Sequence, residues 1–172
     1  MNHIENMFVY SLLNDREDNI EGDNFKQFLL YCLKQSTYFS VTSWEKKGTI
    51  MIPELQDSFD QSFQTHLWYC CKTGKEQPLN IMLYRSSPSL LDGILKYFDR
   101  LFPECIYTDS IEDICFFQDN RLLFGSVSHE HIAELVLSSE TELKAYEKFA
   151  AWKKVELSAR DYEFYPDLGE RV

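Results

Sequence analysis

The residues best placed for chemistry are two histidines, His129 and His131, at the end of an apolar stretch. Histidines at positions i and i+2 of a β-strand lie on the same face and can share a metal ion. A zinc site needs three or four ligands, and no spacing motif adds one to this pair, since Glu130 would lie on the opposite face. We therefore expect a polar strand edge and no bound metal. A metal-dependent hydrolase that uses His129 and His131 remains an alternative.

Sequence motifs of other catalytic sites are missing from the chain. The five cysteines include no C-x₂-C pair, and we expect them to be reduced thiols. The six glycines are isolated, which excludes the usual phosphate-binding and dinucleotide-binding loops. No G-x-S-x-G sequence marks a nucleophile. The sequence therefore favours a protein that is not an enzyme and that uses no cofactor.

The charge of the chain is unusual for its apolar content. Its formal net charge is −11, although 44% of its residues are hydrophobic and 15% are aromatic. So much apolar sequence can form a core, and the acidic side chains must then lie on the surface of a folded domain. Such a surface repels nucleic acid and anionic membranes and attracts basic proteins. We expect a basic protein as partner, and neither nucleic acid nor a membrane.

Acidic side chains concentrate in two segments, one before the first predicted helix and one in an aromatic C-terminal tail at about residues 158–172. The aromatic residues of the tail either pack on the domain or contact a partner, and packing is favoured because monomers seldom expose aromatic clusters. We predict that both segments contact the partner. The predicted contact residues are Asp15, Glu17, Asp18, Glu21, Asp161, Tyr162, Glu163, Phe164, Tyr165 and Asp167.

Three segments have the sequence pattern of a principal helix. The first places apolar residues at helical spacing from Phe25 to Leu33, with Asp23 or Asn24 as a cap. The second begins at Ser87 and Pro88, has an apolar stripe that reaches Phe102, and ends before Pro103. The third begins at Ser139, which forms a capping-box pattern with Glu142. A shorter helix is predicted at 53–59.

A β-hairpin at about 114–127 is predicted to form the centre of the fold. Its two apolar segments flank Asp119 and Asn120, which suit a tight turn, with Phe117 facing Leu122. Both faces of the hairpin are apolar, as in strands that are covered on both sides. Segments 65–71 and 79–84 predict a second hairpin. The predicted fold class is α+β, a mainly antiparallel sheet with this central hairpin packed against three principal helices. Residues 1–172 are expected to form one globular domain that carries the tail.

Residues 113–130 read DICFFQDNRLLFGSVSHE. This stretch resembles the central hairpin of small acidic bacterial immunity proteins, the cytoplasmic partners of secreted or contact-delivered toxins. The resemblance implies inhibition by binding, in which the acidic protein covers the basic active face of a toxin that is often a nuclease. It assigns no individual functional residue in this sequence.

The sequence as a whole predicts an acidic binding protein, and the resemblance suggests an immunity-type inhibitor of a basic toxin. A homodimeric structural or adaptor subunit with an aromatic interface is a further alternative, and the oligomeric state stays open. A cytoplasmic location is expected for two reasons. No apolar run approaches the roughly 20 residues that span a bilayer, and the first residues lack a basic segment and cleavage site of a signal peptide.

Overall fold

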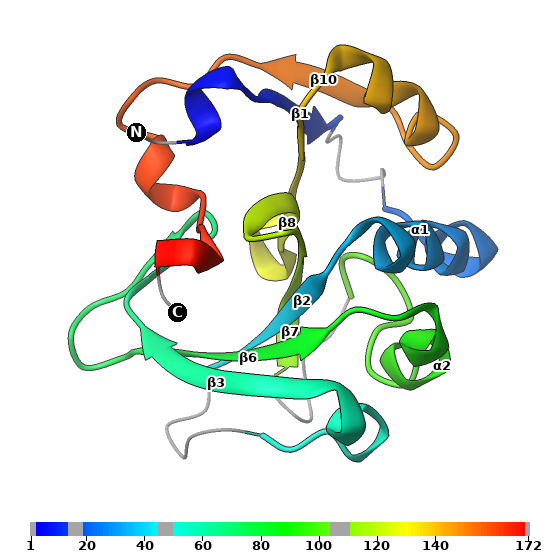
Figure 1. The fold of residues 1–172 in the computed structure, drawn as a ribbon, viewed down its shortest axis with the longest axis vertical. Helices are drawn as coiled ribbons and strands as arrows, with labels where there is room; N and C mark the ends of the chain where they lie inside the picture. Colours follow the sequence, from blue (N-terminus) through cyan, green and yellow to red (C-terminus); the bar gives the residue numbers. More distant parts are fainter. Residues whose placement is uncertain (1–2, 14–18, 45–49, 104–110, 171–172) are drawn as a thin grey trace.

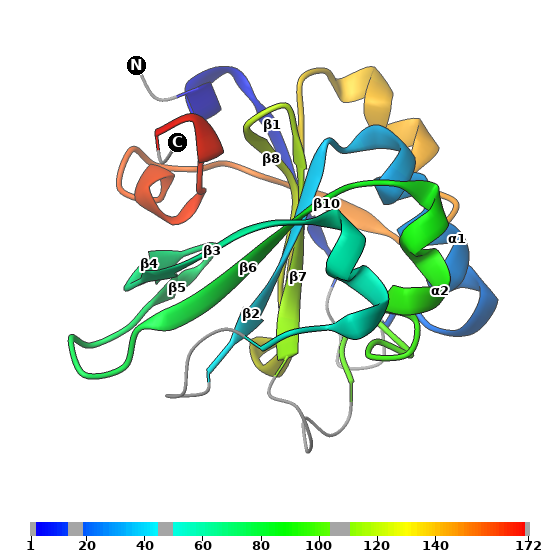
Figure 2. The same cartoon turned by 60° about the horizontal axis from the view of Figure 1, so that its bottom comes forward.

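The computed structural model describes residues 3–13, 19–44, 50–103 and 111–170. Its main element is an eight-stranded antiparallel sheet with the strand order β10-β1-β9-β8-β7-β2-β6-β3 (Figures 1 and 2). Strands β4 and β5 form a separate two-stranded sheet. The strands are β1 (Phe8–Leu12), β2 (Tyr38–Ser43), β3 (Phe59–Thr65), β4 (Leu67–Trp68), β5 (Cys71–Lys72), β6 (Leu79–Arg85), β7 (Ile111–Gln118), β8 (Arg121–Val127), β9 (Ile132–Leu137) and β10 (Trp152–Val155).

The described residues contain only two α-helices, α1 (Gly22–Gln35) and the single turn α2 (Leu91–Ile94). The predicted fold class, with three principal helices packed on the sheet, is therefore wrong, and the molecule is dominated by its sheet. No helix among the described residues is long and apolar enough to cross a membrane. The remaining helical turns are 3₁₀ helices, at His3–Asn6, Pro53–Ser58, Pro88–Leu90, Ser128–Glu130, Glu140–Ala145, Tyr162–Phe164 and Leu168–Glu170.

Helix α1 alone matches its sequence pattern at full length. Its buried side chains are Phe25, Phe28, Leu29, Cys32 and Leu33, which form the predicted apolar stripe. The predicted caps are not used: residue 21 is the N-cap, and the Asn24 side-chain amide instead donates to the carbonyl oxygen of Phe149 at 2.5 Å. The stripe lies against one face of the sheet, where the rings of Phe28 and Phe124 are 5.0 Å apart.

The second predicted helix starts at its predicted cap but ends early. Ser87 accepts a hydrogen bond from the amide of Ser89 at 3.4 Å. Farther along, the backbone bonds to another segment: the Leu101 amide donates to the Ile20 carbonyl at 2.9 Å, and the Phe102 amide donates to the Asn19 side chain at 3.0 Å. These tertiary hydrogen bonds replace helical ones, so the apolar residues reach the core without a helix.

The third predicted helix is a 3₁₀ helix followed by turns. Its capping box does not form, because the Glu142 carboxylate accepts hydrogen bonds from the hydroxyls of Ser138 and Ser139 and not from a backbone amide. The aromatic residues still face inward, and the rings of Tyr146 and Tyr31 are 5.1 Å apart. The apolar spacing indicated correctly which side chains are buried, whereas packing against α1 set the backbone conformation.

The hairpin of β7 and β8 occupies the middle of the sheet, and both of its faces are buried. Phe116 and Phe124 belong to a hydrophobic cluster on the α1 side, and Phe117 and Leu122 belong to a second cluster on the opposite side. Phe117 pairs with Leu122, as predicted. A bulge at Leu123 then shifts the register, so that Phe116 and not Cys115 lies opposite Phe124.

The second predicted hairpin has a different first strand. β6 pairs with β3, at Phe59–Thr65, and not with the segment 65–71. β3 is an edge strand with a mixed, half-exposed burial pattern, so its sequence carries little apolar alternation. Residues 67–72 form the small sheet of β4 and β5, which places Trp68 and Tyr69 over the face opposite α1.

The Phe117→Ala variant should lose about 3–5 kcal/mol of unfolding free energy, the usual cost of deleting a fully buried phenylalanine side chain. Phe117 is 0% exposed, and its ring lies 5.8 Å from that of Trp68. Met51 is 54% exposed, so the matched variant Met51→Ala should change the free energy by no more than about 0.5 kcal/mol. Equilibrium denaturation with urea measures both. Equal effects in the two variants would show that the hairpin is not the buried centre of the fold.

Candidate functional site

The C-terminal tail folds back on the sheet face opposite α1. Tyr165 and Leu168 are buried in the second hydrophobic cluster, as expected for a tail that packs on the domain. Two backbone hydrogen bonds fix the tail: the Cys70 amide donates to the Phe164 carbonyl at 3.1 Å, and the Leu168 amide donates to the Asn120 carbonyl at 2.8 Å. Figure 1 shows the tail, in orange and red, on the other side of the sheet from α1 and α2.

The docked tail forms one wall of a groove of about 400 Å³. Three carboxylates line it, from Glu134 of β9, from Glu156 just before the tail and from Asp161 within the tail. Apolar side chains complete the lining, among them those of Ile132, Val155, Leu157 and Phe164. The described lining contains no lysine or arginine, so this groove combines negative charge with apolar walls.

The structure brings together some of the predicted contact residues and separates others. Asp161, Phe164 and Tyr165 line the groove, and Tyr162 lines an adjacent hollow that shares residues 155–157 with it. Asp15, Glu17 and Asp18 lie outside the described residues.

The other three predicted contact residues interact elsewhere. Glu21 precedes α1, where its carboxylate lies 3.2 Å from the Arg100 guanidinium. Glu163 lies 3.9 Å from the Lys72 ammonium group, and Asp167 forms an isolated β-bridge with Arg121. Sequence reasoning missed Glu134 as a groove residue. It lies within the apolar strand β9, where the alternation of side chains places it on the face that carries the groove.

The Glu134 carboxylate is held in the floor of the groove by two tyrosines. Its Oε2 atom accepts a hydrogen bond from the Tyr69 hydroxyl at 2.9 Å and another from the Tyr165 hydroxyl at 2.6 Å. Burial, and secondly the charge of Glu134, raise the pKa of both tyrosines. Both hydroxyls therefore stay protonated and act as donors. Burial also raises the pKa of Cys70 to about 12, which leaves its thiol protonated and unreactive.

A glycine lets Tyr69 reach across the sheet to Glu134. Gly125 of β8 pairs with Glu134 of β9, and the Tyr69 ring lies directly on the glycine backbone. A Cβ atom at residue 125 would approach Tyr69 Cδ1 and Cγ to 2.6 Å, closer than a carbon contact allows. Residue 125 must therefore lack a side chain for Tyr69 to pack on the sheet and reach Glu134 in the floor of the groove.

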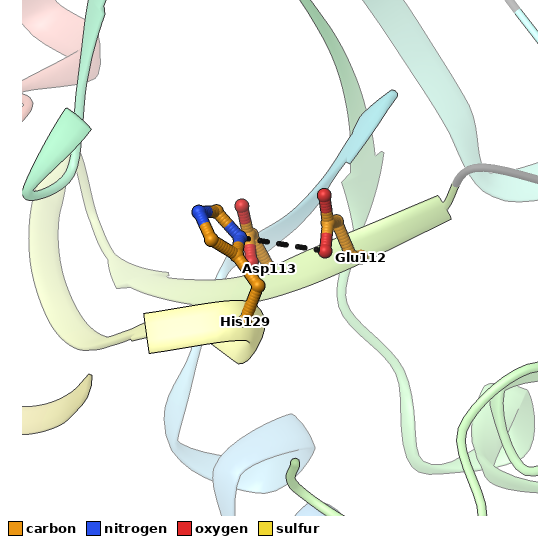
Figure 3. Close-up of side chains that lie close together, drawn as sticks. All are labelled: Glu112, Asp113 and His129. Carbon is orange, nitrogen blue, oxygen red and sulfur yellow. Dashed lines mark ion pairs between the residues drawn. The ribbon is translucent and has the colours of Figure 1, made fainter. Parts of the chain in front are cut away.

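A second group of titratable side chains lies at the open end of the central hairpin, away from its turn at Asp119 and Asn120. Glu112, Asp113 and His129 each present one potential ligand atom, and these atoms all lie within 4.8 Å of one another. Both carboxylates are buried, while the His129 side chain is 41% exposed. Figure 3 shows the two carboxylates on one side of β7, with the His129 imidazole reaching them from the turn after β8.

A β-bulge places both carboxylates on the same side. β2 and β7 pair at Ser40–Cys115 and at Thr42–Glu112, so Val41 alone opposes two residues of β7. Asp113 is one of them and has a φ of 57°. In a regular strand, neighbouring residues point to opposite faces. The bulge removes this alternation, which is a common way to redirect a side chain.

Ser128 fixes the turn of His129 to this bulge. Its amide donates to Asp113 Oδ1 at 2.7 Å, and its hydroxyl accepts a hydrogen bond from the Asp113 amide at 3.3 Å. His129 follows at once, with its Nδ1 atom 3.7 Å from Glu112 Oε2 and its ring 5.8 Å from that of Trp44. Burial raises the pKa of Glu112, against the lowering effects of His129 and, to a smaller extent, of the Trp44 side chain. Burial, and then the Glu112 charge, raise the pKa of Asp113 to about 7.

The predicted pair of His129 and His131 does not converge. Residues Ser128–Glu130 form a 3₁₀ turn instead of a strand, and His131 has a φ of 54°. Its imidazole stacks on the Phe102 ring at 5.1 Å, within the α1 side of the molecule. Side chains alternate between faces in a strand but not in a turn, so His129 and His131 do not share a face. The titratable neighbours of His129 are instead Glu112 and Asp113. No spacing in the sequence indicated them.

Comparison with known proteins places the chain in no family. No protein-family model matches it, and no characterised protein or solved structure shows significant similarity to it.

The Gly125→Ala variant should lose about 1–3 kcal/mol of unfolding free energy, because the new methyl group forces the Tyr69 ring off the sheet. A Cβ atom at residue 74 would meet nothing within 4 Å, so Gly74→Ala should change the free energy by about 0.5 kcal/mol or less. Thermal and urea denaturation measure both variants. If Gly125→Ala is as stable as Gly74→Ala, the contact between Tyr69 and the glycine backbone is not a packing constraint.

Stability should depend on pH through Asp113. Its pKa is about 7 in the folded protein against an ordinary value of 3.8, so the folded state binds this proton more tightly. This contribution is complete below the ordinary value and is lost as the pH rises towards about 7. In EDTA, the unfolding free energy should fall between about pH 5 and pH 8 by a few kcal/mol, at about 1.4 kcal/mol per tenfold change in proton affinity.

Two variants check the origin of this dependence. Asp113→Asn keeps an oxygen for the Ser128 amide but carries no titratable group, so its pH dependence should be smaller by the same few kcal/mol. The exposed carboxylate of Asp57 provides a control, since Asp57→Asn should keep the wild-type dependence. An unchanged slope in Asp113→Asn would rule out Asp113 as the titrating group.

Proposed function

We propose that this chain is a non-enzymatic binding protein that captures a basic protein partner at the groove of Glu134, Glu156 and Asp161. The observation that supports the proposal is the lining of this groove, in which three carboxylates are set among apolar walls. Lysine and arginine side chains match such a lining, because their aliphatic stems pack on apolar surface while their charged ends meet carboxylates.

The carboxylate in the floor supports binding by preorganisation. Glu134 already has two hydroxyl donors on one oxygen, so its side chain is fixed before a partner arrives. Fixed polar groups lose less conformational entropy on binding than mobile ones. Glu156 and Asp161 lie nearer the surface and extend the negative charge towards solvent. A net charge of −11 adds long-range attraction, which increases the rate of encounter with a basic protein.

The proposed biological role is that of a cytoplasmic immunity-type inhibitor, which covers the active face of a basic toxin. This role rests on the likeness of residues 113–130 to immunity-protein hairpins and on the acidity of the chain. A basic active face is common in enzymes that act on nucleic acid, because such enzymes must bind phosphates. An acidic protein that binds this face excludes the substrate without any chemistry of its own.

The direct test is inhibition. A basic protein that co-purifies with the chain from its native host is assayed for toxicity and nuclease activity, with and without the purified chain. The proposal expects that one equivalent of the chain abolishes the activity and that co-expression restores growth. A partner that is acidic, or a toxin that keeps its activity in the complex, would contradict the proposal.

Association kinetics test the groove itself. In the Glu156→Gln/Asp161→Asn double variant, the association rate constant should fall about tenfold at low salt, because two charges that steer the encounter are removed. Raising salt from about 50 to 300 mM should slow the wild type more than the variant, since the screening length shortens over this range. Glu76→Gln removes one exposed charge in the loop after β5 and serves as the control, with only a small effect. An association rate that responds to neither salt nor the double substitution excludes the groove as the contact site.

A further inference from the structure

The group of Glu112, Asp113 and His129 is independent of the groove and of the function proposed for it. It lies where the β7 bulge meets the turn after β8, whereas Tyr69, Glu134 and the tail form the groove. We infer that Glu112, Asp113 and His129 form a binding site for a divalent transition-metal cation, with Zn²⁺ as the ion that fits best.

The spacing of the three side chains suits a single ion. Zinc lies about 2.0–2.2 Å from carboxylate oxygens and imidazole nitrogens, so two of its ligands are separated by no more than about 4.4 Å. The three candidate ligand atoms lie within 4.8 Å of one another, and Glu112 Oε2 is 3.7 Å from His129 Nδ1. The 3.7 Å distance lies within the range that two ligands of one zinc ion can span.

The buried carboxylate of Glu112 provides a separate argument. The residue is only 5% exposed, and its Oε2 atom has no hydrogen-bond partner of normal geometry among the described residues, although the side chains of His129 and Trp44 lie close enough to lower its pKa. Asp113, which is 4% exposed, adds a second carboxylate at the same place. Asp113 Oδ1 already accepts the Ser128 amide, but two adjacent buried carboxylates must either take up a proton or bind a cation to avoid the cost of buried like charges. Figure 3 also shows the Glu112 oxygen directed towards His129, which is where an ion would lie.

The ligand types select the kind of ion. Imidazole suits zinc and other transition metals, whereas magnesium and calcium prefer oxygen ligands alone. Zinc sites with three protein ligands leave a fourth position for water, and here the partly exposed His129 opens the group to solvent.

The scaffold holds the ligands before any ion binds. The bulge places Glu112 and Asp113 on one side, and Ser128 holds the His129 turn against Asp113. The expectation of a metal-free protein rested on a lack of ligands beside His129, and the two carboxylates now provide them. A bound ion would join β7 to the turn between β8 and β9, and so would stabilise the folded state.

Zinc titration of the full-length protein tests the inference. Protein stripped with EDTA and transferred to chelator-free buffer is titrated with ZnCl₂ by calorimetry, and its melting temperature is measured with and without zinc. The expected result is one zinc ion per chain and a higher melting temperature. Glu112→Gln and His129→Gln should each weaken binding by about tenfold or more, because loss of even a hydrogen-bond partner of a metal ligand costs roughly 10–100-fold. In both variants, zinc should no longer raise the melting temperature.

Two histidine controls make the result specific. His66→Gln removes an exposed histidine that is not among the three grouped ligands, and His131→Asn removes the other histidine of the pair first considered, with a residue that tolerates positive φ. Both should bind zinc like the wild type. Because His129 is partly exposed, its substitution should leave the circular dichroism spectrum unchanged. The inference is overturned if the wild type shows no saturable binding, if Glu112→Gln and His129→Gln bind as tightly as the wild type, or if His131→Asn alone abolishes binding.

Discussion

The pairing of β7 with β8 under a hydrophobic layer on each face is the interaction on which the rest of the structure depends. Phe124 packs under α1, and Phe117 packs under Trp68 on the other side, so neither face of the hairpin meets water. A slip in register would set side chains of the wrong shape against both packed layers, which overpacks the core or leaves cavities in it. The hairpin therefore fixes the positions of everything attached to it, which includes Gly125 within β8 and the bulge and turn at its open end.

Two buried acids beside this hairpin are accommodated in different ways. Glu134 receives hydrogen bonds from two tyrosine hydroxyls, which compensate for the water it has lost. Glu112 has no donor of normal hydrogen-bond geometry at its Oε2 atom, and only the side chains of His129, at 3.7 Å, and of Trp44 act on it. The first arrangement is complete within the protein and serves as a fixed negative floor for a groove. The second is less complete, and the inferred cation would complete it. The same physical cost, burial of a carboxylate, thus underlies both the proposed capture of a basic partner and the inferred metal site.

Sequence reasoning succeeded where the signal was local and repeated. The stripe from Phe25 to Leu33 specified α1, and Asp119 with Asn120 specified a two-residue connection between strands that pair as Phe117 with Leu122. It failed at residues 88–102 and 139–149, because apolar spacing reports which side chains are buried and does not report whether the backbone bonds within its own segment. At residues 100–102 those bonds go to residues 19–21. The tail was expected to pack on the domain, and it does, but its groove depends on Glu134, about thirty residues away in sequence.

The sequence by itself determined an acidic chain with a substantial apolar core, a helix at 25–33 and a strand pair around residue 120, because composition and short-range periodicity carry that information. Only the tertiary structure decided which polar residues meet. Glu112 and Asp113 share one side because of a bulge opposite Val41, and His129 joins them because a turn replaces the strand that would have aligned it with His131. Such contacts depend on register between strands that are distant in the chain, and no local pattern encodes that register.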